Sequence, residues 1–374
     1  MRIGGGVVYG GPRANALPLL LSHGRASVRC YSSSSTPDHV AFVKDIAATQ
    51  PPEHLSQLLN VLKAKGETIV FPGAKQGLIP LAIPLTKSSS GAVTALLRWP
   101  TAPPGMEMPV VDVNKHGVKL LAKSVDQYIH RILVEEDAKN SQERNDELFI
   151  VSADAGKKLY QKGGFAESKI SNLDIYLLKE VGLFPDIIER KVMRHFEEGD
   201  QVSALVTGEF YTKKEHFPGF ARPFVFNAEV LLRFVVIFST MYGRSKIDTG
   251  LCFHRGRPFC FIDRVGRNVE AKDAARGALK SPWWTLGCKY EDVAKIAQWD
   301  DEQIEYIKEK VTEEGRQEDI KKGKAPAQVV LDEAAFLMDL ASIEGTWDDY
   351  LERIAECYEE AGLNDIARFI LHRD

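Results

Sequence analysis

Residues 78–99 read LIPLAIPLTKSSSGAVTALLRW, and this stretch decides the fold class. Two apolar runs, Leu78–Thr86 and Val93–Trp99, flank a polar turn that is rich in Ser and Gly. Short apolar runs joined by such a turn are typical of a β-hairpin. Because proline has no backbone N–H to donate, Pro80 and Pro84 place the first of these strands at a sheet edge in our prediction.

Helical and strand-like segments alternate on both sides of this hairpin. The patterns predict helices at His39–Ala48, Glu53–Lys65, Ser124–Asp137, Leu173–Val181 and Asp186–Glu197, and strands at Glu67–Phe71, Pro109–Val113, Leu148–Ser152 and Val202–Tyr211. Residues Phe224–Phe238 fit either helix or strand. The mixture predicts an α+β body over residues 36–289, with a split into two subdomains near 140–147 left open.

The last 85 residues differ from this body in charge and in pattern. Residues 290–374 hold 23 acidic and 10 basic residues, whereas residues 36–289 hold 29 acidic and 34 basic ones. Such a shift indicates a boundary, and we expect the adjacent Trp283 and Trp284 to pack the two parts together. The pattern predicts an acidic, all-helical region with helices at Glu291–Gln298, Asp301–Glu314, Pro326–Ser342, Trp347–Ala361 and Asp365–His372.

The first 35 residues contain four arginines and no Asp or Glu, and they end in four serines. This composition is typical of an organelle transit peptide. Arg29 lies two residues before Tyr31, as in mitochondrial processing sites, so we expect residues 1–31 to be removed. The prediction is import into the mitochondrial matrix, with a plastid transit peptide or a flexible tail as the alternatives.

Composition further limits the class of protein. The most apolar run, Val230–Tyr242, contains Arg233 and is shorter than the ~20 residues of a membrane span. We therefore expect a soluble protein or one that contacts a membrane peripherally. The sequence has no Cys-x-x-Cys pair and no nucleotide-binding or hydrolase motif, so it predicts no cofactor and no metal.

The strongest candidate surface is Tyr242–Arg267, which the pattern predicts to form a hairpin of Thr249–His254 and Pro258–Asp263. Basic side chains are interleaved there with phenylalanines. Such a surface can bind RNA, a phosphorylated ligand or an acidic protein partner. Its alternative is an amphipathic hairpin whose phenylalanines face the core and whose arginines face water or an acidic partner, such as the acidic C-terminal part of the same chain. The candidate binding residues are Arg244, Lys246, His254, Arg255, Arg257, Arg264 and Arg267.

Two other features allow alternative interpretations. Cys252 and Cys260 can lie opposite each other on that hairpin, with Cys288 further on, as free buried thiols, a zinc site or a reversible disulfide. The loop His216–Pro223 contains two prolines, a glycine and two phenylalanines. It is either an ordered loop that its own aromatics hold in place, or a lid or partner-binding loop.

The absence of a catalytic motif and the separation of charge favour an interaction or assembly role. Complementary charge directs protein docking. We therefore hypothesise an accessory subunit or factor of a large mitochondrial complex, such as a respiratory complex or the mitoribosome, with protein partners. The alternatives are an enzyme acting on a phosphorylated or carboxylated metabolite and an RNA-binding protein.

Overall fold

The structure is a computed structural model that describes residues 38–373, except for 103–105, 141, 244–258 and 300. It gives the backbone but not the side chains of residues 153–154, 234–243 and 259–266. The predicted transit peptide, residues 1–31, lies outside the described residues.

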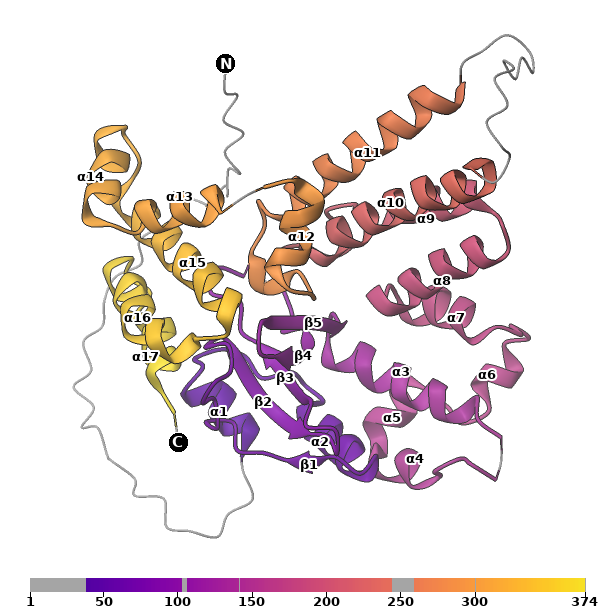
Figure 1. Cartoon of the computed structure of the whole chain (residues 1–374). Helices are drawn as coiled ribbons and strands as arrows, with labels where there is room; N and C mark the ends of the chain where they lie inside the picture. Colours follow the sequence, from indigo (N-terminus) through magenta and orange to yellow (C-terminus); the bar gives the residue numbers. More distant parts are fainter. Residues whose placement is uncertain (1–37, 103–105, 141, 244–258, 300, 374) are drawn as a thin grey trace, which may run out of the picture. The chain divides into compact units, whose positions relative to one another are not determined.

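Five strands form one antiparallel sheet in which each strand pairs with the next (Figure 1). The predicted hairpin is confirmed, since β2 and β3 pair antiparallel from Ala82–Leu97 to Lys87–Val93. The predicted strand Pro109–Val113 is confirmed as β4, whereas β5 was not predicted. The strands are β1 (Thr68–Ile69), β2 (Ala82–Lys87), β3 (Val93–Leu97), β4 (Val110–Asn114) and β5 (Gly117–Ala122).

The prediction that β2 is an edge strand is wrong, because β1 pairs with its last two residues. Pro84 nevertheless lies beyond the end of β1, so no neighbouring strand on that side needs its missing N–H. The register shifts between Pro84 and Thr86, as it does at a β-bulge. The ring Nε2 of His39 lies 3.0 Å from the Pro84 carbonyl oxygen, so α1 covers this irregular part of the strand.

Helices precede and follow the sheet in the first 181 residues of the chain, and most of them are short. The predicted helices around residues 39–48, 53–65, 124–137 and 173–181 are confirmed, the last as an α-turn followed by a π-helical turn. The predicted strand Leu148–Ser152 is wrong, because these residues form α4 and its C-cap. The elements are α1 (His39–Asp45), α2 (Leu55–Ala64), α3 (Val125–Asp137), α4 (Glu147–Val151), α5 (Ala153–Leu159), α6 (Gly164–Glu167), α7 (Leu173–Tyr176) and η1 (Leu177–Val181).

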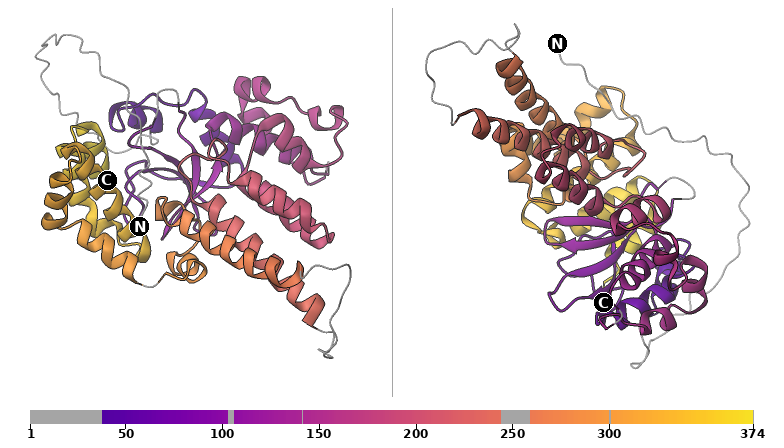
Figure 2. Two further views of the ribbon diagram at one scale, coloured as in Figure 1. Left: turned by 90° about the horizontal axis from the view of Figure 1, so that it is seen from above. Right: turned by 90° about the vertical axis from the view of Figure 1, so that its right-hand side faces the viewer.

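Four longer helices follow, namely α8 (Pro185–Glu197), α9 (Gln201–Tyr211), α10 (Arg222–Gly243) and α11 (Phe259–Ala278). The predicted helix Asp186–Glu197 is confirmed as α8. The ambiguous segment 224–238 is helical and lies in α10. Figure 2 shows α10 and α11 side by side.

Two strand predictions in this region are wrong. Residues Val202–Tyr211 are helical because the Asp200 side chain caps the Ser203 N–H at 3.0 Å and the face of Ala204, Gly208 and Tyr211 is buried. The second strand of the predicted hairpin is also wrong, since residues 259–263 form the first turns of α11. Its first strand, residues 249–254, lies outside the described residues.

The C-terminal region is helical, as predicted, and the α+β fold class is confirmed. The predicted helix Asp301–Glu314 is interrupted at Thr312, whose hydroxyl accepts from the Gly315 N–H at 3.1 Å and begins a new helix. The elements are η2 (Trp283–Thr285), α12 (Tyr290–Ala297), α13 (Glu302–Lys310), α14 (Glu313–Lys321), α15 (Pro326–Glu344), η3 (Trp347–Tyr350), α16 (Leu351–Glu360) and α17 (Asn364–Leu371).

Helices α13–α17 lie on one side of the sheet and α3–α8 lie on the other (Figures 1 and 2). The buried Trp347 donates from Nε1 to the Lys115 carbonyl oxygen in the β4–β5 turn at 3.0 Å. Gly345 has a φ of +71°, and a Cβ there would come within 2.5 Å of the same oxygen. Only glycine therefore allows this approach.

Lys75 makes a second contact between the sheet region and the C-terminal helices. Its side chain is fully buried, and Nζ donates to the Phe369 carbonyl oxygen at 2.8 Å. The same ammonium lies 3.7 Å from the centroid of the Phe369 ring. Burial, and then the charge of Arg373, lowers the pKa of Lys75 well below its ordinary value.

The two adjacent tryptophans pack the body against the C-terminal helices, as predicted. The Trp283 backbone N–H donates to Asp339 Oδ1 of α15 at 2.6 Å. The Trp284 ring lies 5.1 Å from the ring of Trp99, which follows β3. The indoles of Trp283 and Trp284 are both buried, so the turn η2 is part of the core that joins the body to the C-terminal helices.

Replacing Trp347 should release the C-terminal helices from the sheet. Trp347→Ala removes a fully buried side chain and should lower the free energy of unfolding by about 3–5 kcal/mol. Hydrogen–deuterium exchange should rise first in α15–α17 and in the β4–β5 turn. Tyr306→Ala, at a side chain that is 50% exposed, is the control and should leave exchange unchanged. Equal hydrogen–deuterium exchange in Trp347→Ala and Tyr306→Ala would show that Trp347 does not hold the C-terminal helices against the sheet.

Asp339 should make stability depend on pH in a defined direction. Burial raises the pKa of Asp339 well above its ordinary value, although the bond from the Trp283 N–H partly opposes this. The folded state then keeps a proton that the unfolded state releases near pH ~4, so Asp339 lowers stability as pH rises above ~4. Asp339→Asn keeps the acceptor oxygen and cannot ionise.

We therefore expect Asp339→Asn to match the wild type in chemical denaturation near pH 4. It should be more stable than the wild type at pH 7–8, by ~1.4 kcal/mol for each pKa unit by which burial separates the folded and unfolded states. A difference between the two proteins that stays constant from pH 4 to pH 8 would show that ionisation of Asp339 is irrelevant.

Candidate docking site between the sheet and the middle helices

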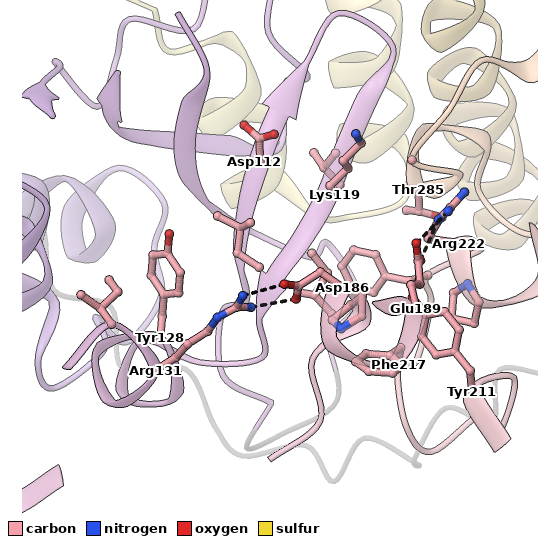
Figure 3. A pocket seen from close by; sticks show the side chains of 18 of the residues that line it. Asp112, Lys119, Tyr128, Arg131, Asp186, Glu189, Tyr211, Phe217, Arg222 and Thr285 are labelled. Atoms are coloured by element: carbon pink, nitrogen blue, oxygen red, sulfur yellow. Dashed lines mark hydrogen bonds and ion pairs between the residues drawn. The ribbon is translucent and has the colours of Figure 1, made fainter. Parts of the chain in front are cut away.

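A cavity of about 410 Å³ lies where the sheet region meets α8, α9 and the loop 216–223 (Figure 3). We call it the interdomain cavity. One wall comes from β4, β5 and α3, and the other from α8, the end of α9 and the loop. It is lined by Lys65, Asp112, Val118, Lys119, Leu120, Leu121, Tyr128, Arg131, Ile132, Glu135, Pro185, Asp186, Glu189, Tyr211, Phe217, Phe220, Arg222, Pro223, Thr285 and Gly287.

Arg131 of α3 crosses from one wall to the other. Its guanidinium makes two parallel hydrogen bonds to Asp186 of α8, at 2.8 and 2.6 Å, and a third to Glu135 at 2.8 Å. The group also lies 4.7 Å from the ring centroid of Phe184. Burial alone would lower the pKa of Arg131, but the two carboxylates outweigh it and raise the pKa.

Arg222 forms a similar pair with a second carboxylate of α8 in the same cavity. It donates to both carboxylate oxygens of Glu189, each at 2.8 Å, and to Glu229 at 3.1 Å. The Tyr211 hydroxyl also donates to Glu189, at 3.2 Å. Burial opposes the charge of Arg222, yet the hydrogen bonds and charges of Glu189 and Glu229 raise its pKa. Burial also raises the pKa of Tyr211 well above its ordinary value.

Both arginines are therefore neutralised within the protein. Asp186 and Glu189 lie three residues apart on α8, so one helix face supplies a carboxylate to each guanidinium. The polar groups that remain include Asp112 and Lys119, which are directly opposite each other on β4 and β5. Burial raises the pKa of Asp112, and the charge of Lys119 partly offsets this. The interdomain cavity thus presents a shaped, nearly neutral surface.

A second hollow, of about 330 Å³, lies on the other side of the same loop. We call it the apolar pocket. It shares Leu120, Phe217 and Phe220 with the interdomain cavity, so these three side chains separate the two hollows. The apolar pocket is lined by Met106, Glu107, Pro109, Leu120, Lys123, Ser124, Phe217, Pro218 and Phe220.

The loop between the hollows is held rigidly, which agrees with the interpretation that its aromatics pin it. Phe217 and Phe220 are buried, and the Phe220 ring lies 5.8 Å from the Trp99 ring. Gly219 has a φ of +82°, and a Cβ there would lie 2.7 Å from the Trp99 ring. The Ala221 N–H donates to the Thr285 hydroxyl at 2.9 Å, which fixes the end of the loop.

Most residues of the predicted basic surface lie outside the described residues, namely Arg244, Lys246, His254, Arg255 and Arg257. The side chain of Arg264 in α11 is likewise not described. Arg267 lies further along α11 and pairs with Glu270 at 2.6 Å. The structure therefore does not bring Arg267 into either hollow.

The cysteine alternatives are partly resolved. Cys288 and Cys357 are free thiols. Burial raises the pKa of Cys288 to about 11 and that of Cys357 to about 12. Cys252 and the side chain of Cys260 lie outside the described part. Within the described residues, no group of three His, Cys, Asp or Glu side chains is placed to hold a metal ion.

Sequence reasoning did not single out Arg131, Asp186 or Glu189. Each occupies a helix position that reads as an ordinary surface charge. The available signal was Arg222, which lies inside the unusual loop and beside Pro223.

Among the helices that the structure describes, none is long and apolar enough to cross a membrane.

Comparison with known proteins identifies the family. A relative from Arabidopsis thaliana, "Protein IN CHLOROPLAST ATPASE BIOGENESIS, chloroplastic", is 62% identical over 361 residues, which cover 96% of this chain and 97% of the relative. Family models described as PAB N-terminal, PAB middle domain and PAB C-terminal domain match residues 37–180, 185–235 with 253–300, and 304–372. The chain belongs to the PAB family. No solved structure matches it.

The PAB segments show which parts of the chain build the interdomain cavity. Arg131 lies in the PAB N-terminal segment, whereas Asp186, Glu189 and Arg222 lie in the PAB middle domain. The interdomain cavity is therefore built at the boundary between two family segments, and the Arg131–Asp186 pair crosses that boundary. Small-molecule and cofactor pockets occur preferentially at such boundaries.

Asp186→Asn should weaken the contact between these two segments. The carboxylate is 47% exposed and Arg131 keeps Glu135, so we expect a loss of only about 1–2 kcal/mol in the free energy of unfolding. Asp292→Asn, at an exposed pair with Lys295 on α12, is the matched control and should change stability by less than ~0.5 kcal/mol. Equal effects of the two substitutions in urea unfolding would show that the Arg131–Asp186 pair is of no special importance.

Proposed function

We propose that this protein acts in plastids as an assembly factor in the biogenesis of the chloroplast ATPase. The observation that carries the proposal is the identity of 62% over nearly the whole of both chains. That similarity spans all three PAB segments and so includes both walls of the interdomain cavity. It supports the assembly role that the charge separation suggested.

The proposed compartment corrects the sequence-based expectation of a mitochondrial matrix protein. The name of the relative gives a chloroplastic location, which favours the plastid alternative over the mitochondrion. An Arg- and Ser-rich segment without acidic residues is common to both kinds of transit peptide, so composition alone did not discriminate. Cleavage after Tyr31 stays a prediction.

The geometry supports docking of a protein partner. Arg131 and Arg222 are both partly buried and paired with carboxylates of the same chain, and the loop between the two hollows is held by a hydrogen bond to Thr285. A preformed, largely uncharged surface costs little conformational entropy on binding. RNA binding and peripheral membrane contact gain no support from the comparisons. The alternative of an enzyme whose substrate is held by Arg255, Arg257 and Arg264 stays a hypothesis, because these side chains lie outside the described part of the structure.

The test is complementation of an Arabidopsis thaliana line that lacks the relative. The full-length chain should restore accumulation of the assembled ATPase on native gels. The chain without residues 1–31 should fail, and addition of an unrelated plastid transit peptide should rescue it. Comparison of these two shortened proteins separates targeting from function. A full-length protein that reaches the plastid and leaves ATPase accumulation at the mutant level would overturn the proposal.

A further inference from the structure

The apolar pocket combines an apolar wall with one half-buried cation. Met106, Pro109, Leu120, Phe217 and Phe220 supply the wall. At about 330 Å³, the pocket has room for one or two apolar side chains of a partner. Ser124 and the exposed Glu107 complete the lining, so Lys123 is the positively charged group in it.

Lys123 has no carboxylate partner among the described residues, since no ion pair involves its Nζ. Its contact is with the Phe217 ring, whose centroid lies 5.3 Å from Nζ. Partial burial lowers the pKa of Lys123. A half-buried ammonium without a counter-ion gains when a carboxylate approaches it, because its surroundings have a lower dielectric constant than water.

The shape of the pocket exists before anything binds. Phe217 and Phe220 are fixed by the contacts of their loop with Trp99 and Thr285. Apolar side chains that enter such a preformed hollow displace water without reordering the wall. The pocket is therefore suited to an anchor residue of a partner chain.

We propose that the apolar pocket binds an extended segment of a partner protein that carries an apolar side chain next to an Asp or Glu. The apolar side chain fills the hollow, and the carboxylate pairs with Lys123. The inference rests on the proposed function only for the identity of the partner, which we take to be an unassembled ATPase subunit. The charge and the lining of the pocket themselves determine the chemistry of the segment.

A peptide array tests this inference directly. Overlapping peptides from all chloroplast ATPase subunits, and from subunits of other chloroplast complexes for comparison, are probed with the purified chain that begins at residue 32. Bound peptides should be enriched in apolar residues adjacent to Asp or Glu. Replacing that acidic residue by Gln in the best peptide should weaken binding by on the order of tenfold in fluorescence anisotropy.

Charge reversal gives the sharpest control. Lys123→Glu should abolish binding of the acidic peptide and should bind the version in which Lys replaces the acidic residue. Lys63→Glu makes the same charge change at an exposed side chain of α2 that lines neither the interdomain cavity nor the apolar pocket. This variant should bind the acidic peptide normally. Circular dichroism melts confirm that both variants fold.

Several outcomes would overturn the inference. They are an array without bound peptides, peptide binding that does not depend on the acidic residue, and equal losses of binding in the Lys123→Glu and Lys63→Glu variants. Because the array measures binding in isolation, its failure is distinct from a failure of complementation. Peptides bound from proteins of other complexes, with the same dependence on Lys123, would support the pocket and contradict the identity of the partner.

Discussion

The stacking of Trp99 against Phe220 and Trp284 is the contact on which the rest of the site depends. These rings come from the end of β3, from the loop before α10 and from η2, and their centroids lie 5.8 and 5.1 Å from that of Trp99. Gly219 lets the loop lie directly on the indole. Because both hollows use the walls that this contact fixes, neither can exist before residues more than a hundred positions apart have met.

The charges of α8 complete that arrangement. Asp186 holds Arg131 of the PAB N-terminal segment, and Glu189 holds Arg222 of the middle domain. Buried charges persist only when they are paired, so the two carboxylates are required by the arginines that they face. The result is a boundary that is specific in geometry and nearly neutral in charge, which suits the docking of a protein better than the capture of a small anion.

The parts of the fold that could be predicted are those with local signals. The β2–β3 hairpin follows from two apolar runs and a polar turn, and the C-terminal helices follow from apolar spacing. Helix α9 was mistaken for a strand because Val202, Val206 and Thr207 favour strands, whereas the Asp200 cap and a buried face decide the outcome. The second strand of the predicted hairpin failed because residues 259–263 continue into a long helix packed on α10.

The candidate site was beyond sequence reasoning for a physical reason. A paired arginine such as Arg131 has the same local pattern whether its partner is water or Asp186, which lies 55 positions away. Lys123 shows the same limit in a different way. It precedes the Ser124 cap in the sequence, and this position does not reveal that its ammonium lies over the Phe217 ring. Tertiary contacts turn both from surface charges into site residues, one neutralised and one left with an aromatic ring as its neighbour. In the interdomain cavity the arginines are paired with carboxylates, whereas in the apolar pocket the ammonium of Lys123 can still pair with a carboxylate of a partner.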